Sequence, residues 1–212
     1  SGFILLRNER FELAFDAMSF YGGHQHCGRL QLLLWAGEEA VLADIGCCSY
    51  DFYDFYIWVM SEEAHSVVSC AAFPEREAKR TIGILSFDGE HNRAAAKMTV
   101  QYENRSYDCV RTLELSTSGL EITDRVTASE AMEFSGRWYL GGRPTILDDS
   151  HAARQLLQAG VLELRSDLPL RLDRTPAMND FNQLAWLERL TWTHTGSDFC
   201  VRTVITAASG PA

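Results

Sequence analysis

Three histidines and one aspartate in the first third of the chain have the side chains needed to bind a metal ion. His24, His26, Asp44 and His65 each stand at the edge of an apolar run typical of a β-strand. Imidazole nitrogens and carboxylate oxygens suit a tetrahedral Zn²⁺ site. Residues two apart on a strand point to the same side, so His24 and His26 could face one pocket. The residue types alone leave two hypotheses open: a zinc site, or ordinary hydrogen-bonded residues at strand ends.

The elements that would position these side chains are short strands separated by turn signals. The first two hairpins are expected from Phe3 to Arg7 with Phe11 to Ala17, and from Leu30 to Ala36 with Ala40 to Ile45. Further strands are expected at Thr81 to Phe87, Ala94 to Tyr102, Tyr107 to Leu115, Leu120 to Ala128, Glu133 to Leu140, Arg154 to Gln158, Val161 to Arg165, Leu170 to Arg174, Leu184 to Trp192 and Phe199 to Ala207. Turns at this spacing with few helical periods predict an all-β fold, an antiparallel two-sheet β-sandwich that forms one domain over residues 1–212.

Residues 50–60, YDFYDFYIWVM, are densely aromatic. Aromatic side chains of this kind either fill a core or form a platform on which sugar rings stack, and general burial tendencies favour the core. Asp51 and Asp54 indicate that part of the segment faces solvent.

Composition narrows the class of partner. The chain has 212 residues and a net charge of −10, with 46% hydrophobic and 23% charged residues. Nucleic-acid binding relies on Lys and Arg contacts to phosphate, so this charge argues against it. The apolar runs are strand-sized and fall short of a membrane span. The six cysteines include no C-x-x-C pair, which argues against the usual structural zinc spacing and leaves Cys27 as a packed thiol or an adventitious ligand.

The order of three motifs resembles the C-terminal β-sandwich domain of the heparinase II/III-like polysaccharide lyases. The first is His24-Gln25-His26 followed by Leu30, the second is Asp44-Ile45-Gly46 followed by Tyr50, and the third is Ala64-His65-Ser66-Val67-Val68. The opening SGFILLRNERFELAFDA also resembles the start of that domain. The family pattern has an Asp where this chain has Gly28, and Asn-Thr where it has Ser66-Val67.

The resemblance implies a reaction and a set of residue roles. The reaction is β-elimination on a uronic-acid-containing polysaccharide, in which the C5 proton is removed and the oxygen at C4 leaves. It implies a zinc ion held by His26, Asp44 and His65, with His24 as the catalytic histidine. We assign Tyr50 and Tyr56 to substrate binding.

The resemblance also implies a partner domain, an N-terminal helical toroid that carries much of the catalytic machinery. Because the chain begins at Ser1-Gly2 without methionine, we expect it to be a domain of a longer protein, inactive as a lyase when isolated. The expected ligand is an acidic polysaccharide or oligosaccharide, and the family favours a periplasmic or secreted location.

Two other function classes stay open. The chain is alternatively a non-catalytic, metal-stabilised carbohydrate-binding or interaction module, and the departure at Gly28 favours this class. A cupin-like metal oxygenase is the weaker alternative, because that family needs a Glu about four residues after its H-x-H, where this chain has Leu30.

Overall fold

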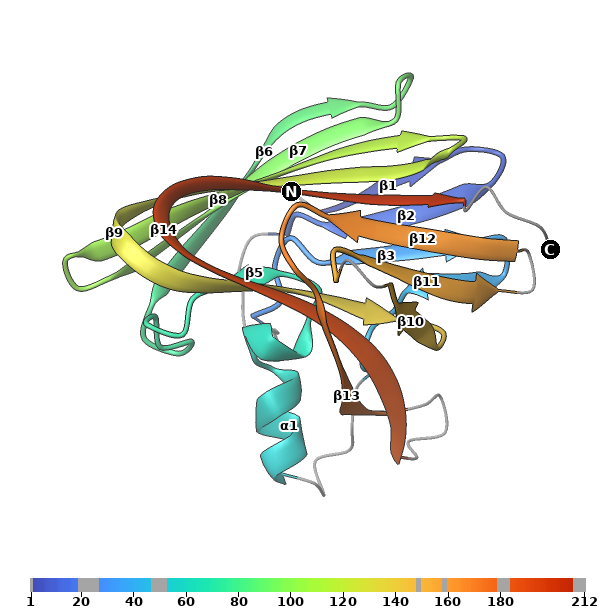
Figure 1. Cartoon of the computed structure of the whole chain (residues 1–212). Coiled ribbons are helices and arrows are strands. Elements are labelled where there is room, and N and C mark those ends of the chain that lie inside the picture. The colour runs from blue at the N-terminus through green and yellow to red at the C-terminus, as the bar shows by residue number, and fades with distance from the viewer. Residues whose placement is uncertain are drawn as a thin grey trace.

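The computed structural model describes residues 2–18, 27–46, 53–147, 150–157, 160–178 and 184–207. Nearly all of its regular elements are strands (Figure 1). In chain order the elements are β1 (Phe3–Arg7), β2 (Phe11–Asp16), β3 (Leu32–Ala36), β4 (Glu39–Leu42), α1 (Tyr53–Val59), the 3₁₀ turn η1 (Glu62–Ala64), β5 (Val68–Ser69), β6 (Lys79–Asp88), β7 (Arg93–Tyr102), β8 (Arg105–Ser116), β9 (Gly119–Leu140), β10 (Pro144–Ile146), β11 (Ala152–Leu157), β12 (Gly160–Ser166), β13 (Arg171–Met178) and β14 (Leu184–Ala207).

The strands form two antiparallel layers that share β9 and β14. The first layer has the strand order β6, β7, β8, β9, β14, β12, β11 and β10. It uses the first part of β9, which pairs with the last part of β14. The second layer has the strand order β1, β2, β3, β4, β9, β14 and β13. It uses the second part of β9, which pairs with the first part of β14. The predicted antiparallel β-sandwich is therefore confirmed.

The strands β9 and β14 are each longer than predicted, because each one replaces two predicted strands. The sequence predicted two separate strands on either side of residues 129–130, and two more on either side of residues 193–198. The structure instead bends β9 and β14 without ending them (Figure 1). A register shift marks the bend: Gly196 pairs with Met132 and Asp198 with Thr127, so β9 has residues 128–131 where β14 has Ser197 alone. Extra residues on one strand let the ladder bend while pairing resumes beyond them.

Alternate residues of the strands fill the core between the layers. In β9, Ile122, Val126, Phe134 and Trp138 are fully buried on one face. Gly136 lies on the same face, and a Cβ at this position would stand 2.2 Å from the indole of Trp192. The core therefore needs glycine at that position to seat the indole.

Residues 53–59 of the aromatic segment form a helix, α1, packed on the outer face of the layer that contains β1 to β4. Its Val59 is buried with Ile45, Tyr139 and Ala177 in a small second cluster, and Tyr56 packs partly buried against it. Val59 thus contributes to core packing, the use favoured for this segment, while Phe55, Tyr56 and Trp58 are only half-buried. Within the described residues, the structure contains no helix long and apolar enough to span a membrane.

Candidate metal centre

A pocket of about 340 Å³ opens on the outer face of the layer that contains β1 to β4. Phe3, Ala14 and Leu33 come from three neighbouring strands and form its apolar floor. Asp44, just beyond β4, and His65, just beyond η1, form its polar end. We call this the Asp44–His65 pocket.

The pocket brings together two of the three predicted metal ligands. His65 Nδ1 lies 3.5 Å from Asp44 Oδ2. Two ligand atoms that each bind one tetrahedral Zn²⁺ at about 2.0–2.1 Å stand about 3.3 Å apart. The spacing therefore suits either a direct polar contact or a shared metal ion.

The other ring nitrogen of His65 fixes the orientation of the imidazole. His65 is 3% exposed, and its Nε2 lies 3.0 Å from the carbonyl oxygen of Val59. A carbonyl can only accept, so Nε2 carries a proton. Nδ1 then faces Asp44 in one of two forms: as a donor to the carboxylate when the ring is protonated, or as a lone pair available to a metal ion when the ring is neutral. Metal-binding histidines are commonly held this way, with the second nitrogen donating to a carbonyl or carboxylate.

Asp44 is held in its ionised form. Its side chain is 34% exposed, the Gly46 amide donates to Oδ1 at 2.8 Å, and Gln31 Nε2 donates to Oδ2. Burial opposes ionisation of this carboxyl, but the contacts with His65, Gln31 and Gly46 outweigh it and lower its pKa. A carboxylate is the form that binds a metal ion, so both described candidates present suitable atoms.

The backbone that follows His26 runs directly against His65. A Cβ at Gly28 would stand 2.2 Å from Cγ of the imidazole, and the Cys27 amide donates to the carbonyl of Met60 at 2.8 Å. Glycine at position 28 therefore has a steric reason, because any side chain would displace the imidazole. In the sequence analysis, glycine in place of the family's aspartate at position 28 favoured a non-catalytic module. The close contact with His65 gives a local structural reason for this glycine.

The remaining predicted ligand and the catalytic histidine lie outside the described residues. This holds for His26, His24 and also Tyr50. Within the described part of the chain, no group of three His, Cys, Asp or Glu side chains is arranged to hold a metal ion. The assignments of these three residues stay predictions.

The segment that carries both histidines is fixed where it leaves and rejoins the described chain. Asp16 Oδ2 accepts from Arg29 Nη1 at 2.7 Å, with both side chains largely buried. The Leu30 amide donates to the carbonyl of Asp16 at 2.9 Å, and the Asp16 amide donates to the carbonyl of Gln31 at 3.0 Å. These contacts hold the two ends of the segment side by side at the pocket.

Cys27 is poorly suited to act as a ligand at neutral pH. Burial raises the pKa of its thiol to about 11, against the lowering effect of the nearby Arg80 guanidinium. Metals bind the thiolate, so a protonated thiol agrees with the interpretation of Cys27 as a packed residue.

A buried arginine that the sequence reasoning missed ties the pocket's loops to the sandwich. Arg111 is 1% exposed and binds both carboxylate oxygens of Asp124, at 2.7 and 2.8 Å. Its Nη1 donates to the carbonyls of Leu30 and Ser66, each at 2.7 Å. These carbonyls belong to the two loops that carry Gly28 and His65. Arg111 therefore joins both loops to one point in the core.

A sequence signal for this arginine did exist. Arg111 alternates with Cys109 and Leu113 on the apolar face of β8, while Asp124 alternates with Ile122 and Val126 on the apolar face of β9. Two opposite charges on apolar faces of consecutive strands indicate a buried ion pair, since a charge in the core needs a partner.

The described aromatic candidate, Tyr56, packs in the cluster around Val59 and does not line the Asp44–His65 pocket. Its assignment to substrate binding stays a prediction.

Comparisons with known proteins agree on the fold and the family. The model of the family described as heparinase II/III-like, C-terminal, matches residues 1–193. A search of curated proteins finds no match.

Among solved structures, a heparinase III with methylated lysines is similar with a TM-score of 0.83 at 13% identity, covering 99% of this chain and 35% of its own. A mutant of the heparan sulfate lyase HepC from Pedobacter heparinus gives a TM-score of 0.79 at 12% identity, covering 100% of this chain and 36% of its own. A galactose mutarotase-like protein from Lactobacillus casei gives 0.53 at 11%, with 97% and 99% covered.

The chain thus spans about a third of the length of the heparinase III and HepC chains. Identities this low establish only the shared fold, whereas the family model covers nearly the whole sequence. On that match, the chain belongs to the heparinase II/III-like C-terminal family.

Proposed function

We propose that this chain is the sandwich domain of a polysaccharide lyase that acts by β-elimination on a uronic-acid-containing glycan. In this proposal His26, Asp44 and His65 hold one Zn²⁺, and His24 faces the substrate. An N-terminal helical toroid domain completes the active site. The family membership supports the lyase class, and the relatives named as lyases have chains about three times as long.

The observation that carries the proposal is the arrangement of Asp44 and His65. Their ligand atoms lie 3.5 Å apart, one in an ionised carboxylate and one on an imidazole nitrogen oriented by the Val59 carbonyl. The segment bearing His26 rejoins the chain against the same imidazole, at Gly28. A third ligand arriving from that segment would complete a set of nitrogen and oxygen donors that suits Zn²⁺.

In this proposal the zinc ion has a structural role and His24 a catalytic one. A bound Zn²⁺ would link three separate loops and so stabilise the fold around the pocket. His24 is separated from His26 by one residue, so a link at His26 would also limit the positions open to His24. β-Elimination needs a group that moves a proton and groups that offset the uronate charge, and His24 supplies the first.

Metal analysis of two neighbouring variants tests the zinc assignment. We expect wild type to contain one zinc ion per chain. His26→Ala should lose the metal and melt at a lower temperature, whereas His24→Ala should keep both the metal and the melting temperature. A metal-free wild type, or loss of zinc in His24→Ala instead, would contradict the assignment.

Activity assays test the dependence on a second domain. Among the described residues that line the Asp44–His65 pocket, the Arg29 guanidinium is already paired with Asp16, and this proposal uses Asp44 and His65 as zinc ligands. We therefore expect negligible formation of unsaturated product when this chain alone is incubated with uronic-acid polymers. Robust turnover by the isolated chain would refute that part of the proposal.

A further inference from the structure

A second pocket lies on the arm formed by β13 and β14. It has a volume of about 380 Å³ and shares no residue with the Asp44–His65 pocket. β14 pairs with β9 only from Glu188 onward, so residues 184–187 pair with β13 alone and extend past the end of β9. Figure 1 shows this arm projecting from the sandwich beside α1.

The two faces of the arm differ in what covers them. Leu187 and Ala177 point toward the cluster around α1. Trp186 and Glu188 alternate with Leu187 and so point to the opposite face, where Arg174 stands directly across from Glu188. In the described residues no helix packs on that second face, and Trp186 is 60% exposed there.

Trp186 is exposed, whereas the other tryptophans of the described residues are buried or half-buried. Trp138 and Trp192 are 0% and 1% exposed. A large indole left in water forgoes the burial that stabilises Trp138 and Trp192, and tryptophan is enriched at binding interfaces. The flat ring offers an apolar face with a hydrogen-bond donor at its edge.

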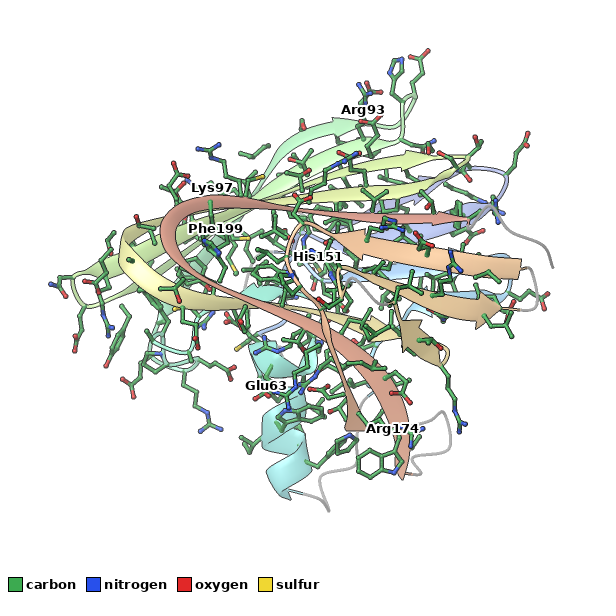
Figure 2. The ribbon with its side chains drawn as sticks, in the orientation of Figure 1. Glu63, Arg93, Lys97, His151, Arg174 and Phe199 are labelled. Atoms are coloured by element: carbon green, nitrogen blue, oxygen red, sulfur yellow. The ribbon has the colours of Figure 1, made fainter. Side chains whose placement is uncertain are left out.

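Arginines flank the indole. Arg174 Nε donates to Glu188 Oε1 at 2.7 Å, with the arginine side chain 55% exposed and the glutamate 14%. Glu188 therefore contacts the guanidinium at Nε, while more than half of the arginine side chain stays exposed. Figure 2 shows Arg174 near the end of the arm.

A second arginine, Arg143, lines the same pocket. It is exposed and makes no ion pair with the described residues. The preceding glycines form the pocket's wall in close contact with the sandwich: a Cβ at Gly141 would stand 2.2 Å from the Ala40 carbonyl oxygen, and one at Gly142 would stand 2.8 Å from Gln155 Nε2. This packing fixes the backbone from which Arg143 extends.

We infer that this pocket binds one acidic sugar ring of a saccharide, with the C–H face of the ring on Trp186 and its anionic group on Arg143 and Arg174. A pyranose that carries a carboxylate or sulfate has both the apolar face and the planar or tripodal anion that guanidinium groups bind by paired hydrogen bonds. The volume lies within the range of small-molecule sites. The inference rests on the proposed glycan class and adds a subsite at a distance from the predicted zinc ligands.

Calorimetric titrations with three defined probes test the subsite. The first is an unsulfated hexasaccharide that contains uronic acid, the second a sulfated hexasaccharide without carboxylates, and the third maltohexaose, which is neutral. All are run with EDTA present, so that the result does not depend on whether the chain binds zinc. We expect wild type to bind at least one acidic probe, and Trp186→Ala to weaken that binding by about tenfold or more. Arg143→Ala should remove the preference for the acidic probe over maltohexaose.

Matched controls come from exposed residues outside the pocket. Leu156→Ala removes an apolar side chain that is 73% exposed on β11, and Arg125→Ala removes an arginine that is 61% exposed on β9. Neither should change saccharide affinity, and circular dichroism should show all four variants folded.

Three outcomes would overturn the inference: no binding of any probe by wild type, unchanged affinity in Trp186→Ala, or equal affinity for acidic and neutral probes. Failure of the zinc or lyase proposal would leave these titrations interpretable. The relative affinity for the two acidic probes decides between carboxylate and sulfate.

Discussion

Replacing Arg111 by methionine should destabilise the sandwich and also loosen the two loops at the Asp44–His65 pocket. Arg111 makes a bidentate ion pair with Asp124 in the core and also binds the carbonyls of Leu30 and Ser66. Its guanidinium carbon lies 5.0 Å from the centroid of the Trp138 ring. Methionine keeps an unbranched apolar stem, although it is shorter than arginine, and it removes all four hydrogen bonds.

The expected cost comes mainly from the partner left behind. Breaking a buried ion pair by removing one member costs about 3–5 kcal/mol, because the remaining charge is buried without compensation. Each unsatisfied carbonyl adds about 1 kcal/mol or more. For a domain of this size, 1 kcal/mol corresponds to about 2–4 °C, so we expect a fall in melting temperature of about 10 °C or more.

The double variant Arg111→Met with Asp124→Leu makes the prediction specific. Replacing a whole buried ion pair by apolar side chains is often close to neutral, so the melting temperature should recover most of its loss. The Leu30 and Ser66 carbonyls still lack their donor, so the loops should stay loose. We therefore expect zinc affinity, measured by competition with a chelator, to remain lowered in the double variant.

Amide hydrogen exchange provides a readout that does not depend on zinc. Exchange should be faster in residues 27–31 and 65–67 of both variants than in wild type. Arg125→Met serves as the control, since its ion pair with Asp198 is about 60% exposed on both sides and should contribute less than about 1 kcal/mol. Recovery of both stability and zinc affinity in the double variant would refute the idea that Arg111 holds the two loops.

Three further predictions concern close packing and charge. Gly28→Ala should lower zinc affinity by about 10- to 100-fold in a chelator competition, because its methyl group would displace the ring of His65; unchanged affinity would refute this. Gly136→Ala should destabilise the fold by about 1–3 kcal/mol in urea unfolding, because the methyl group would overlap the Trp192 indole; a neutral effect would mean that the core relaxes freely. Burial opposes ionisation of Glu163, but hydrogen bonds from Arg154 and Arg165 outweigh burial and lower the pKa of this carboxyl. The ionised carboxylate therefore stabilises the fold above the ordinary pKa of 4.5, and this stabilisation is lost as pH falls through the lowered pKa. Glu163→Gln should therefore be less stable than wild type at about pH 7, with the difference shrinking below about pH 4; a difference that grows toward acid would reverse the sign of the argument.

Local pattern was enough to locate the strands. Alternation of apolar and polar residues is a property of neighbouring positions, so β1 was predicted at its observed bounds and β6 to β8 within about two residues. The aromatic segment was harder to interpret, since tyrosine, phenylalanine and tryptophan favour strands. Packing of Val59 against Ile45 and Tyr139 stabilises a short helix instead.

The sequence by itself determined the all-β class, the family and the residue types of the candidate metal site, because these depend on residue order and short periodicity. Only the tertiary structure decided that Gly28 lies against the imidazole of His65 and that Arg111 joins the loops at Leu30 and Ser66. It also decided that the exposed indole belongs to Trp186, which shares a pocket with Arg143 and Arg174, and not to the aromatic helix. These contacts join residues far apart in the chain, and their formation depends on strand pairing and on the bends in β9 and β14, which no local pattern specifies.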